Sequence, residues 1–355
     1  MSGQLKGPVL VVGTGLLGTS VALACKQRGV EVLLRDVAPE HVRTASGLGA
    51  GKPDDGSAAQ LVVVAVPPDH LGAEIAAALA GSAAVVTDVG SVKSQPLAQL
   101  AALGVGDLKR YVGSHPMAGS ERSGPLAASA TLFEGRPWAI TAHADAAPEA
   151  IALVRELIEL CGAVPVELSP ADHDRAVARV SHLPQLMSSL VAGRLAAAPS
   201  THLALAGQGV RDVTRIAGSD PTLWKQIITA NADAVLAVLD EMKERLERLR
   251  GSVAEADAEA IASLLAEGVA GTAAIPAKHG GVARPMASVF VSLPDQAGEL
   301  ARLFAHVGTL GVSIEDVHID HDPGRPVGLV ELVVEACEAE TLVTSLTEHG
   351  WSVHP

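Results

Sequence analysis

Aromatic residues are scarce in this sequence, although hydrophobic residues are not. Only seven of the 355 residues are aromatic, whereas 48% are hydrophobic. A chain of this length is enough for two or three domains. Its apolar content allows a large core, which must be built mainly from Ala, Val and Leu because large rings are so few.

Cysteines are also few. Cys25, Cys161 and Cys337 lie far apart and show no C-x-x-C spacing, so they support neither a disulfide framework nor a zinc site and are typical of a reducing cytoplasm. The N-terminus runs directly into an expected strand, so we expect no signal peptide. No apolar run reaches about 18 residues, so no membrane span is predicted. A cytoplasmic protein without a membrane partner is expected.

Positive charge is in short supply. The 26 Lys and Arg residues face 40 Asp and Glu residues, which gives a net charge of -14. No basic block offsets this excess, so nucleic acids and anionic membranes are not expected partners. An anionic substrate would need positive charge gathered locally. The 13 histidines show no spacing typical of metal ligands, so no metal site is predicted.

A glycine-rich turn follows the first apolar run, at residues 8–12, and precedes a predicted helix at residues 19–28. The turn consists of Gly13, Thr14, Gly15, Leu16, Leu17 and Gly18. Gly13 permits a tight turn, Gly15 lets the backbone approach a pyrophosphate, and Gly18 lets helix and strand pack closely. The helix N-terminus would supply N–H groups to the phosphates. The pattern predicts a dinucleotide site.

The next strand supports this interpretation. The predicted strand at residues 31–34 ends in Arg35 and Asp36. An acidic residue about 20 positions after the glycines is placed to bind both ribose hydroxyls. The charge of Asp36 would repel a 2′-phosphate, so NAD is the expected cofactor, although Arg35 beside it softens that preference.

Strands and helices then alternate. Strands are predicted at residues 61–66, 84–88 and 110–113, with a helix at 71–79. This alternation indicates a doubly wound, Rossmann-type parallel sheet within a first domain at residues 1–168. Ligands of such sheets lie beyond the carboxyl ends of the strands. Candidate site residues at these ends are Val66, Pro67, Ser91 and His115.

Several ordered motifs carry a family resemblance. Residues 87–93, 115–124 and 211–217 resemble segments of prephenate dehydrogenases, and shorter matches lie at 169–174, 181–184, 220–224 and at Asn231. The resemblance extends over about residues 8–282. It implies a helical substrate and dimerisation domain, placed at residues 169–267, and a homodimer. It also implies that prephenate, or its amino relative arogenate, is the substrate.

The resemblance assigns roles to individual residues. His115 matches the catalytic histidine, and its imidazole titrates near neutrality, so it is able to accept a proton from an alcohol as hydride leaves the same carbon. Ser91 matches a serine that bonds this histidine or the substrate hydroxyl; otherwise it would cap a helix at residues 92–100. Arg215 matches the arginine that holds the ring carboxylate, for which a guanidinium fork is well suited.

Further substrate contacts are expected around these residues. Arg211 would share a helical face with Arg215 and meet the substrate side chain, although both are alternatively exposed helix charges. Ser120 and His182 are also assigned to the substrate. Gln185 stands where many bacterial prephenate enzymes have a histidine, which leaves prephenate and arogenate both open. Four polar residues are either neighbouring or gating groups, or ordinary structural residues: Lys93, Glu121, His173 and Asp174.

Two other functions are considered. A 3-hydroxyacid or 6-phosphogluconate-type dehydrogenase shares the layout but uses a catalytic lysine in its helical domain. Lys225 and Lys243, the only lysines of that region, lie in no such motif. A non-catalytic nucleotide and amino acid sensor would not need His115, Ser91 and Arg215 together. Both alternatives are therefore less favoured.

The remaining segments complete the expected organisation. Helices are predicted at residues 148–161, 170–197, 203–217 and 221–249, with a short strand at 164–167 and a Gly- and Pro-rich linker at 268–286. Residues 287–355 show a β-α-β-β-α-β order, the ferredoxin-like pattern. This part resembles an ACT regulatory domain. Gly298 and Ser313 are its candidate ligand residues, with tyrosine as the expected effector.

Overall fold

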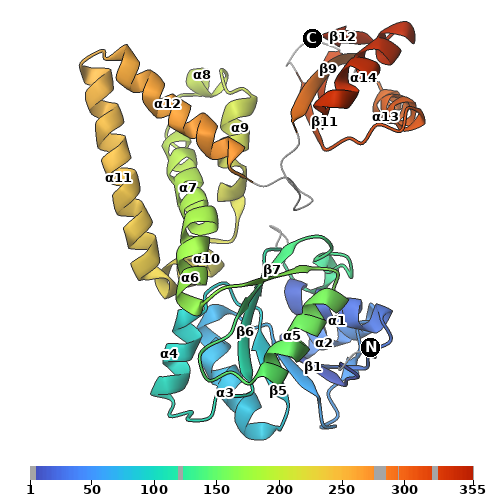
Figure 1. Ribbon diagram of the computed structural model, residues 1–355, viewed down its shortest axis with the longest axis vertical. Coiled ribbons are helices and arrows are strands. Elements are labelled where there is room, and N and C mark those ends of the chain that lie inside the picture. The colour runs from blue at the N-terminus through green and yellow to red at the C-terminus, as the bar shows by residue number, and fades with distance from the viewer. Residues whose placement is uncertain (1–4, 119–122, 276–284, 295, 322–326, 355) are drawn as a thin grey trace. The chain divides into compact units, whose positions relative to one another are not determined.

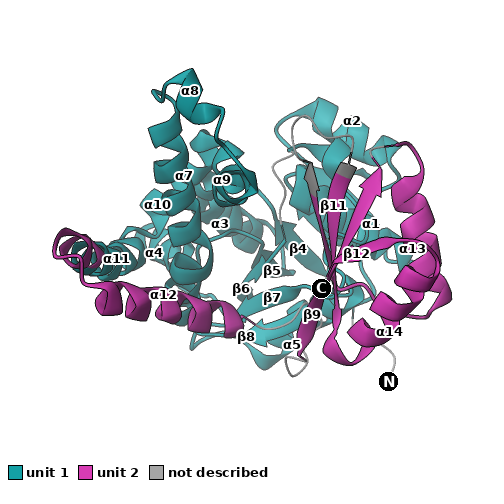
Figure 2. Ribbon diagram, turned by 90° about the horizontal axis from the view of Figure 1, so that it is seen from above, with its two compact units in different colours: residues 1–248 teal, residues 249–355 magenta. Residues whose placement is uncertain are grey.

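The computed structural model describes residues 5–118, 123–275, 285–294, 296–321 and 327–354. The chain divides into two compact units, Met1–Arg248 and Leu249–Pro355 (Figure 2). The predicted site residues Ser120 and Glu121 lie outside the described residues.

An eight-stranded sheet organises the first unit, in the order β3-β2-β1-β4-β5-β6-β7-β8 (Figure 1). Every neighbouring pair is parallel except β6 and β7, which are antiparallel. The central strands β1 and β4 are buried along their whole length, as expected for a sheet covered on both faces. The strands are β1 (Val9–Val12), β2 (Val32–Arg35), β3 (Lys52–Pro53), β4 (Leu61–Val64), β5 (Val85–Asp88), β6 (Tyr111–Pro116), β7 (Pro137–Thr141) and β8 (Val164–Glu167).

Helices cover both faces of this sheet (Figure 1). One core joins α1, α2 and α5 to the sheet through residues such as Val21, Ala45 and Leu157. The other joins α3 and α4 through Ile75 and Leu100. The helices are α1 (Leu16–Gln27), α2 (Pro39–Gly47), α3 (Leu71–Gly81), α4 (Ser94–Ala102) and α5 (Pro148–Leu160), and short 3₁₀ turns lie at η1 (Pro68–His70) and η2 (Pro125–Ala127). The predicted doubly wound architecture is confirmed.

Three details of this unit differ from the sequence-based expectation. Strand β6 continues to Pro116, so His115 lies within a strand and not after it. Strand β7 was not predicted, and its antiparallel pairing with β6 makes the sheet mixed. Its five residues begin with proline, and the pairing depends on β6, which is distant in sequence, so the local pattern alone is weak. Helix α2 and strand β3 were also missed.

The helical part of the first unit is more interrupted than predicted. The expected helix at 170–197 is divided by a π-helical turn, η3 (Ala178–His182), and the expected helix at 221–249 is divided at Asn231. Pro184 lacks an N–H and cannot continue regular bonding at the start of α7, which explains the widened turn before it. The elements are α6 (Pro170–Val177), α7 (Leu183–Leu195), α8 (Ser200–Leu203), α9 (Gln208–Thr214), η4 (Arg215–Gly218), α10 (Pro221–Ala230) and α11 (Ala232–Ala254).

The second unit contains a four-stranded antiparallel sheet in the order β10-β11-β9-β12. Its elements are α12 (Ala258–Ala273), β9 (Met286–Pro294), α13 (Glu299–Thr309), β10 (Asp316–His321), β11 (Val327–Glu335), α14 (Ala336–Glu348) and β12 (Ser352–His354). The predicted β-α-β-β-α-β order is confirmed for 287–355. The linker expected from residue 268 was wrong at its start, because α12 continues through Gly268 and Gly271 to Ala273. In the described parts of the chain, no helix has the length and apolar character needed to cross a membrane.

Candidate active site

The glycine-rich turn connects β1 to α1 and has strict steric requirements. Gly13 has φ +94°, and a Cβ placed on it would lie 2.4 Å from the carbonyl oxygen of Ala65. A Cβ on Gly18 would lie 1.9 Å from the carbonyl oxygen of Gly13. A Cβ on Gly15 would meet nothing within 4 Å. Gly13 and Gly18 therefore hold the turn against β4, whereas Gly15 faces open space next to the start of α1, where a pyrophosphate fits.

Asp36 lies beside this turn, just after the end of β2. Its Oδ2 accepts hydrogen bonds from the backbone N–H of Thr14 at 2.6 Å and from its hydroxyl at 3.0 Å, and Oδ1 accepts one from Ala38 N–H at 2.9 Å. Arg35 is engaged by Asp54, with Nε 2.9 Å from Oδ2. The carboxylate next to an open glycine turn fits the ribose of a dinucleotide. Leu16 and Leu17 begin α1, while Val66 and Pro67 follow β4 on the same edge of the sheet.

A buried ion pair contacts β6 next to His115. Lys93 and Asp88 are almost completely buried, and the Lys93 ammonium pairs with the Asp88 carboxylate and donates to the Ser114 carbonyl oxygen at 2.7 Å. The Tyr111 hydroxyl donates to Asp88 Oδ1 at 2.8 Å. Burial lowers the pKa of Lys93, although the nearby carboxylates counteract it, and burial raises the pKa of Tyr111. This cluster fixes the strand immediately before His115.

His115 lies near the carboxyl end of β6 and contacts a second histidine. Its Nδ1 is 2.9 Å from Nε2 of His173, and the rings meet edge to face with centroids 5.1 Å apart. His173 Nδ1 is in turn 2.9 Å from Asp174 Oδ1. Both partners come from α6, so the helical elements and the sheet meet at this histidine.

Asp174 joins the coenzyme-binding part of the chain to the helices. Its carboxylate accepts the backbone N–H groups of Lys93 and Ser94, both at 2.8 Å, at the start of α4. Its own carbonyl oxygen accepts from Asn231 Nδ2 at 2.9 Å, and the same amide lies 3.2 Å from His182 Nδ1. Asn231 stands at the break between α10 and α11, so this break positions a polar side chain at the site.

Burial favours the neutral form of two histidines of the site, His115 and His182. Burial, reinforced by His173, Lys93 and His182, holds the pKa of His115 well below 6.5. Burial also lowers the pKa of His182 to about 4, although Asp174 opposes this change. An unprotonated imidazole is the form that accepts a proton, so His115 is available as a base at neutral pH.

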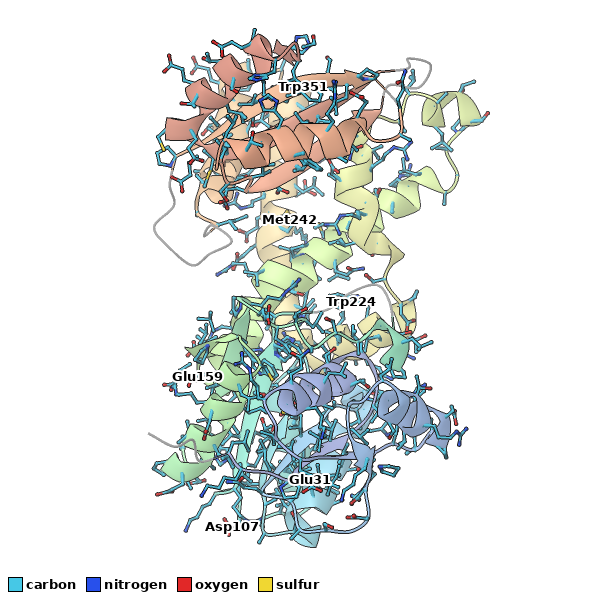
Figure 3. All side chains as sticks on the ribbon, turned by 90° about the vertical axis from the view of Figure 1, so that its right-hand side faces the viewer. Glu31, Asp107, Glu159, Trp224, Met242 and Trp351 are labelled. Carbon is cyan, nitrogen blue, oxygen red and sulfur yellow. The ribbon has the colours of Figure 1, made fainter. Side chains whose placement is uncertain are left out.

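Gln185 and His182 lie on the side of the site formed by α7 and α10. Gln185 is buried and borders a hollow of about 330 Å³ that is also lined by Trp224 and by Ala217 of η4. His182 meets Trp224 edge to face, with ring centroids 6.0 Å apart. Figure 3 places Trp224 where the helical elements meet the part of the chain that carries the parallel sheet. The hollow is large enough for a small organic side chain.

Three predicted residues are placed differently from the expectation. Ser91 lies half-buried in the loop between β5 and α4, and it does not cap a helix, because α4 begins at Ser94 with Lys93 before it. Arg211 belongs to α9, but Arg215 begins the 3₁₀ turn η4, so the two do not share one regular helical face as expected. Both arginines are exposed, and among the described residues neither has an ion-pair partner.

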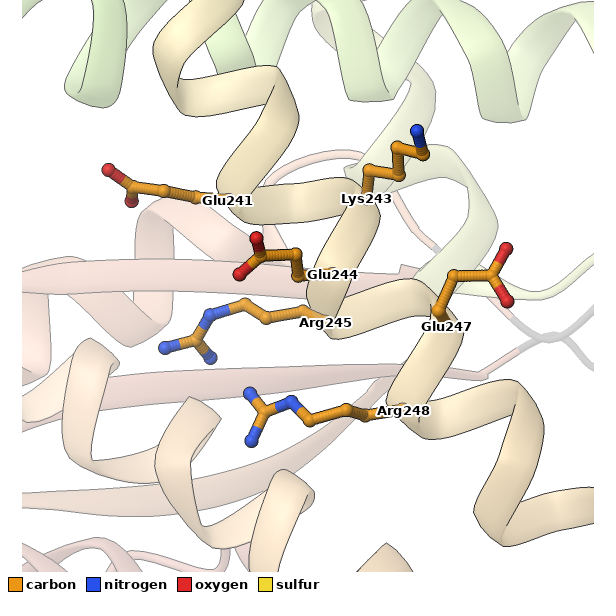
Figure 4. Close-up of a pocket in the computed structure, with 6 residues that line it drawn as sticks. All are labelled: Glu241, Lys243, Glu244, Arg245, Glu247 and Arg248. Carbon is orange, nitrogen blue, oxygen red and sulfur yellow. The ribbon is translucent and has the colours of Figure 1, made fainter.

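A second hollow, of about 530 Å³, lies along α11. Figure 4 shows that all of its labelled side chains project from that helix: Glu241, Lys243, Glu244, Arg245, Glu247 and Arg248. Its mixed charges fit the solvated surface expected from the sequence, and it holds none of the predicted site residues. Within the described ranges, no group of three or more His, Cys, Asp or Glu side chains is arranged to hold a metal ion.

Sequence reasoning did not identify the roles of Asp88 and Tyr111. A signal was present, because Asp88 ends a short strand that begins with two valines, and a carboxylate buried in a sheet needs a cationic partner. Lys93 and Asp174 were noted as neighbouring or gating groups or as ordinary structural residues, without their partners.

The glycine turn with Asp36, and a neutral histidine at the same edge of the sheet, define an NAD-dependent dehydrogenase with a helical second domain. Comparison with known families identifies the particular one. Residues 21–167 match the prephenate dehydrogenase nucleotide-binding domain, and residues 169–267 match the prephenate dehydrogenase dimerization domain. The chain belongs to the prephenate dehydrogenase family.

Individual relatives agree with this assignment. The chain is 37% identical to the probable prephenate dehydrogenase NovF of Streptomyces niveus, over 96% of this chain and 98% of that protein. A crystal structure of prephenate dehydrogenase from A. aeolicus, in complex with hydroxyphenyl propionate and NAD+, has a TM-score of 0.70 and 28% identity, covering 76% of this chain and 98% of that one. The structure of Synechocystis arogenate dehydrogenase has a TM-score of 0.66 and 27% identity, covering 75% and 98%.

Proposed function

We propose that this enzyme oxidises and decarboxylates prephenate to 4-hydroxyphenylpyruvate and CO2 with NAD, a step of tyrosine biosynthesis. The observation that supports this most directly is the neutral imidazole of His115 at the coenzyme edge of the sheet, backed by His173 and Asp174. The family and the relatives named above support the choice of substrate.

The proposed reaction asks the protein to hold one proton and to return it. His115 accepts the proton of the ring C4 hydroxyl as hydride leaves the same carbon, and NAD, when bound, takes up that hydride. The resulting ketone stands opposite the ring carboxylate, whose C–C bond breaks to release CO2. The electron pair of that bond completes the aromatic ring and leaves a phenolate oxygen, which takes back the proton from His115 and becomes the hydroxyl of the product. The residues therefore need only position the substrate and hold one proton between the two steps.

The substrate is an anion, and the arginines are proposed to hold it. Arg215 would bind the ring carboxylate through its guanidinium fork, and Arg211 would meet the side-chain carboxylate. Their exposure, and their lack of an ion-pair partner among the described residues, leave both guanidinium groups available. Ser91 and Ser120 are proposed to contact the hydroxyl end of the substrate, and His182 to border its ring as a neutral group.

Arogenate is the second candidate substrate, because Gln185 is compatible with either compound. Gln185 presents a neutral amide beside the hollow of α7 and α10, and an amide is able to bind a keto acid by donating or an ammonium group by accepting. The similarity to Synechocystis arogenate dehydrogenase is consistent with this alternative. Replacement of Gln185 by His tests the role directly, because it should increase the preference for prephenate over arogenate.

The decisive experiment measures turnover of the full chain with prephenate and arogenate, each with NAD and NADP. Formation of reduced coenzyme is followed by absorbance, and the aromatic product is identified by chromatography. We expect prephenate with NAD to give the highest kcat/KM, because the Asp36 carboxylate disfavours a 2′-phosphate. Absence of turnover with both substrates would contradict the proposal, whereas a higher value with arogenate would select the second candidate.

We also propose that the enzyme is a cytoplasmic homodimer formed through its helical part. Large apolar side chains are exposed there, among them Leu190 (63%), Leu205 (86%) and Leu236 (58%). Exposed apolar groups at this density are typical of an interface between subunits. Sedimentation equilibrium should give twice the 36.1 kDa mass of the chain; a monomeric mass would contradict this proposal.

The C-terminal domain is proposed to be an ACT-like regulatory domain that binds tyrosine. Gly298 precedes α13 with φ +98°, and a Cβ on it would meet nothing within 4 Å, so the backbone is open to a ligand. Ser313 lies in the segment before β10, with its hydroxyl 3.4 Å from Glu315 Oε1. Calorimetry with tyrosine, phenylalanine and tryptophan tests this site. Heat with tyrosine alone is expected, and no heat with any of the three would contradict it.

A further inference from the structure

His115, His173 and Asp174 form a continuous chain of hydrogen bonds. Both links are 2.9 Å long, from His115 Nδ1 to His173 Nε2 and from His173 Nδ1 to Asp174 Oδ1. His173 is 1% exposed and Asp174 5% exposed, so water does not compete for these contacts. In a series of hydrogen bonds shielded from water, the last group, here the Asp174 carboxylate, determines which nitrogen donates and which accepts at each link.

The Asp174 carboxylate determines where the protons lie. Burial raises its pKa, but hydrogen bonds from His173, Ser94 and Lys93 outweigh burial and keep the pKa below its ordinary value. An ionised carboxylate only accepts, so His173 must carry its proton on Nδ1. With that single proton on its ring, His173 presents a lone pair at Nε2, and His115 Nδ1–H donates to it.

This ordering leaves Nε2 of His115 unprotonated. We infer that His173, fixed by Asp174, is a positioning residue that selects the Nδ1–H tautomer of His115, so that Nε2 receives the substrate proton. The inference rests on the proposed function, in which His115 is the base. When the proton arrives at Nε2, the ring becomes an imidazolium whose Nδ1–H still donates to His173. Acceptance of the substrate proton at Nε2 therefore requires no proton transfer from His115 to His173.

Residues around the three hydrogen-bonded side chains hold them in place. Among the described residues, the charged and titratable groups that act on His115 are His173, Lys93 and His182, and Asp174 contacts the far nitrogen of His173. The Asp174 carboxylate accepts hydrogen bonds from backbone N–H groups at the start of α4, and its carbonyl oxygen accepts one from Asn231. The tautomer of His115 is therefore set by residues from both the sheet domain and the helices.

Two substitutions of His173 separate positioning from packing. His173→Leu removes the acceptor, whereas His173→Gln places an amide oxygen near the position of Nε2, where it accepts from His115 Nδ1–H. We expect kcat to fall ~100-fold in His173→Leu, with KM changing less than about threefold, and to recover to within about tenfold of the wild type in His173→Gln. His202→Leu, at an exposed position in α8, serves as the control and should leave kcat unchanged.

Nuclear magnetic resonance of the full chain labelled with 15N-histidine provides a readout that does not depend on activity. The His115 signals are assigned by their loss in His115→Asn. In the wild type near neutral pH the proton should be on Nδ1, and in His173→Leu, where the acceptor that faces Nδ1 has been removed, it should move to Nε2. A wild-type His115 protonated on Nε2 would overturn the inference, as would unchanged kcat in His173→Leu.

The two proposals fail in different ways. If the wild-type enzyme oxidises neither prephenate nor arogenate, the proposed function is wrong, but the wild-type spectrum still decides the tautomer. If His173→Leu does not fold, as judged by thermal melting and by NAD affinity, the wild-type spectrum and the His173→Gln variant carry the test.

Discussion

At the scale of residues, burial sets the protonation of the site. The pKa of His115 is held well below 6.5, mainly by partial burial of the residue and further by His173, Lys93 and His182. The unprotonated form, which is active, is present above the folded-state pKa and is lost only as pH falls through it. We therefore expect kcat/KM to stay constant as pH falls through 6.5 and to decline only at lower pH. A pH profile measures this; a midpoint at the ordinary histidine value would contradict it.

Replacement of the base tests the chemistry itself. His115→Asn keeps a polar side chain of smaller volume but cannot accept the hydroxyl proton at this position. We expect kcat to fall by about two to four orders of magnitude, with little change in the KM for prephenate. Steady-state kinetics supply the measurement, and NAD affinity supplies the control for folding. Full activity in this variant would remove His115 from the proposed mechanism.

Arg215 should affect binding more than turnover. The Arg215→Gln variant loses the guanidinium fork proposed for the ring carboxylate, so KM should rise about 10- to 100-fold, the range expected for loss of a charge-assisted pair. Arg194→Gln is the matched control, because Arg194 is also exposed on a helix of this part of the chain and has no assigned role. Equal KM values in the two variants would contradict the role of Arg215.

The sequence singled out the polar residues of this site but not how they bond. His115 and His173 are 58 positions apart, and Lys93 and Asp174 are 81 positions apart. His115 was selected from its place after a predicted strand, whereas Lys93, His173 and Asp174 were noted only through the family resemblance, with neighbouring, gating and ordinary structural roles left open. Which ring nitrogen faces which depends on the packing of α6 against α4, and no local pattern encodes that contact.

At the scale of elements, the turn between β1 and α1 distinguishes two kinds of glycine. Gly18→Ala would place a Cβ 1.9 Å from a backbone oxygen, so we expect a loss of about 2 kcal/mol or more in the free energy of unfolding. Gly15→Ala meets no neighbour, so the protein should keep its stability but bind NAD at least ~10-fold more weakly, because the methyl group occupies the path of the pyrophosphate.

The two variants are compared by urea unfolding and by NAD titration. Each serves as the control for the other, since both add one methyl group to the same turn. Normal NAD affinity in Gly15→Ala would contradict the placement of the pyrophosphate at this turn.

Buried strands with an apolar sequence were predicted well. Strands β1 and β4 are short apolar runs that lie in the core, and their positions agree with the prediction to within about two residues. Breaks inside helices were not predicted, because the apolar spacing continues across Asn231. That break is stabilised by contacts of its amide with Asp174 and His182, which are remote in sequence.

At the scale of the molecule, the C-terminal domain has a core of its own. Its buried residues, such as Val291, Leu303 and Leu342, all lie between residues 289 and 351. A chain ending at residue 285 should therefore fold and keep kcat within about threefold, while any inhibition by tyrosine should disappear. Turnover with and without tyrosine measures both effects. Loss of folding or of basal turnover in the shortened chain would contradict the independence of this domain.

Composition predicted the character of the cores. The three large aromatic side chains that are fully buried, Tyr111, Phe133 and Trp138, all lie at or near β6 and β7, while the other core positions are mainly Val, Leu, Ile and Ala. Division of the chain at Arg248, inside α11, could not have been predicted, because a continuous helix carries no sequence signal of a boundary there.

The widened turn η3 lies between α6 and α7, and it changes the direction in which the side chains of this continuous helical segment point. In an uninterrupted α-helix, residues nine positions apart face about 180° away from each other. His173 and His182 are such a pair, yet His173 and Asp174 both act electrostatically on His182. The wide turn thus rotates the side chains of α7 relative to those of α6. As a result, His173 of α6 contacts the imidazole of His115, while α7 contributes Gln185 to the hollow beside Trp224.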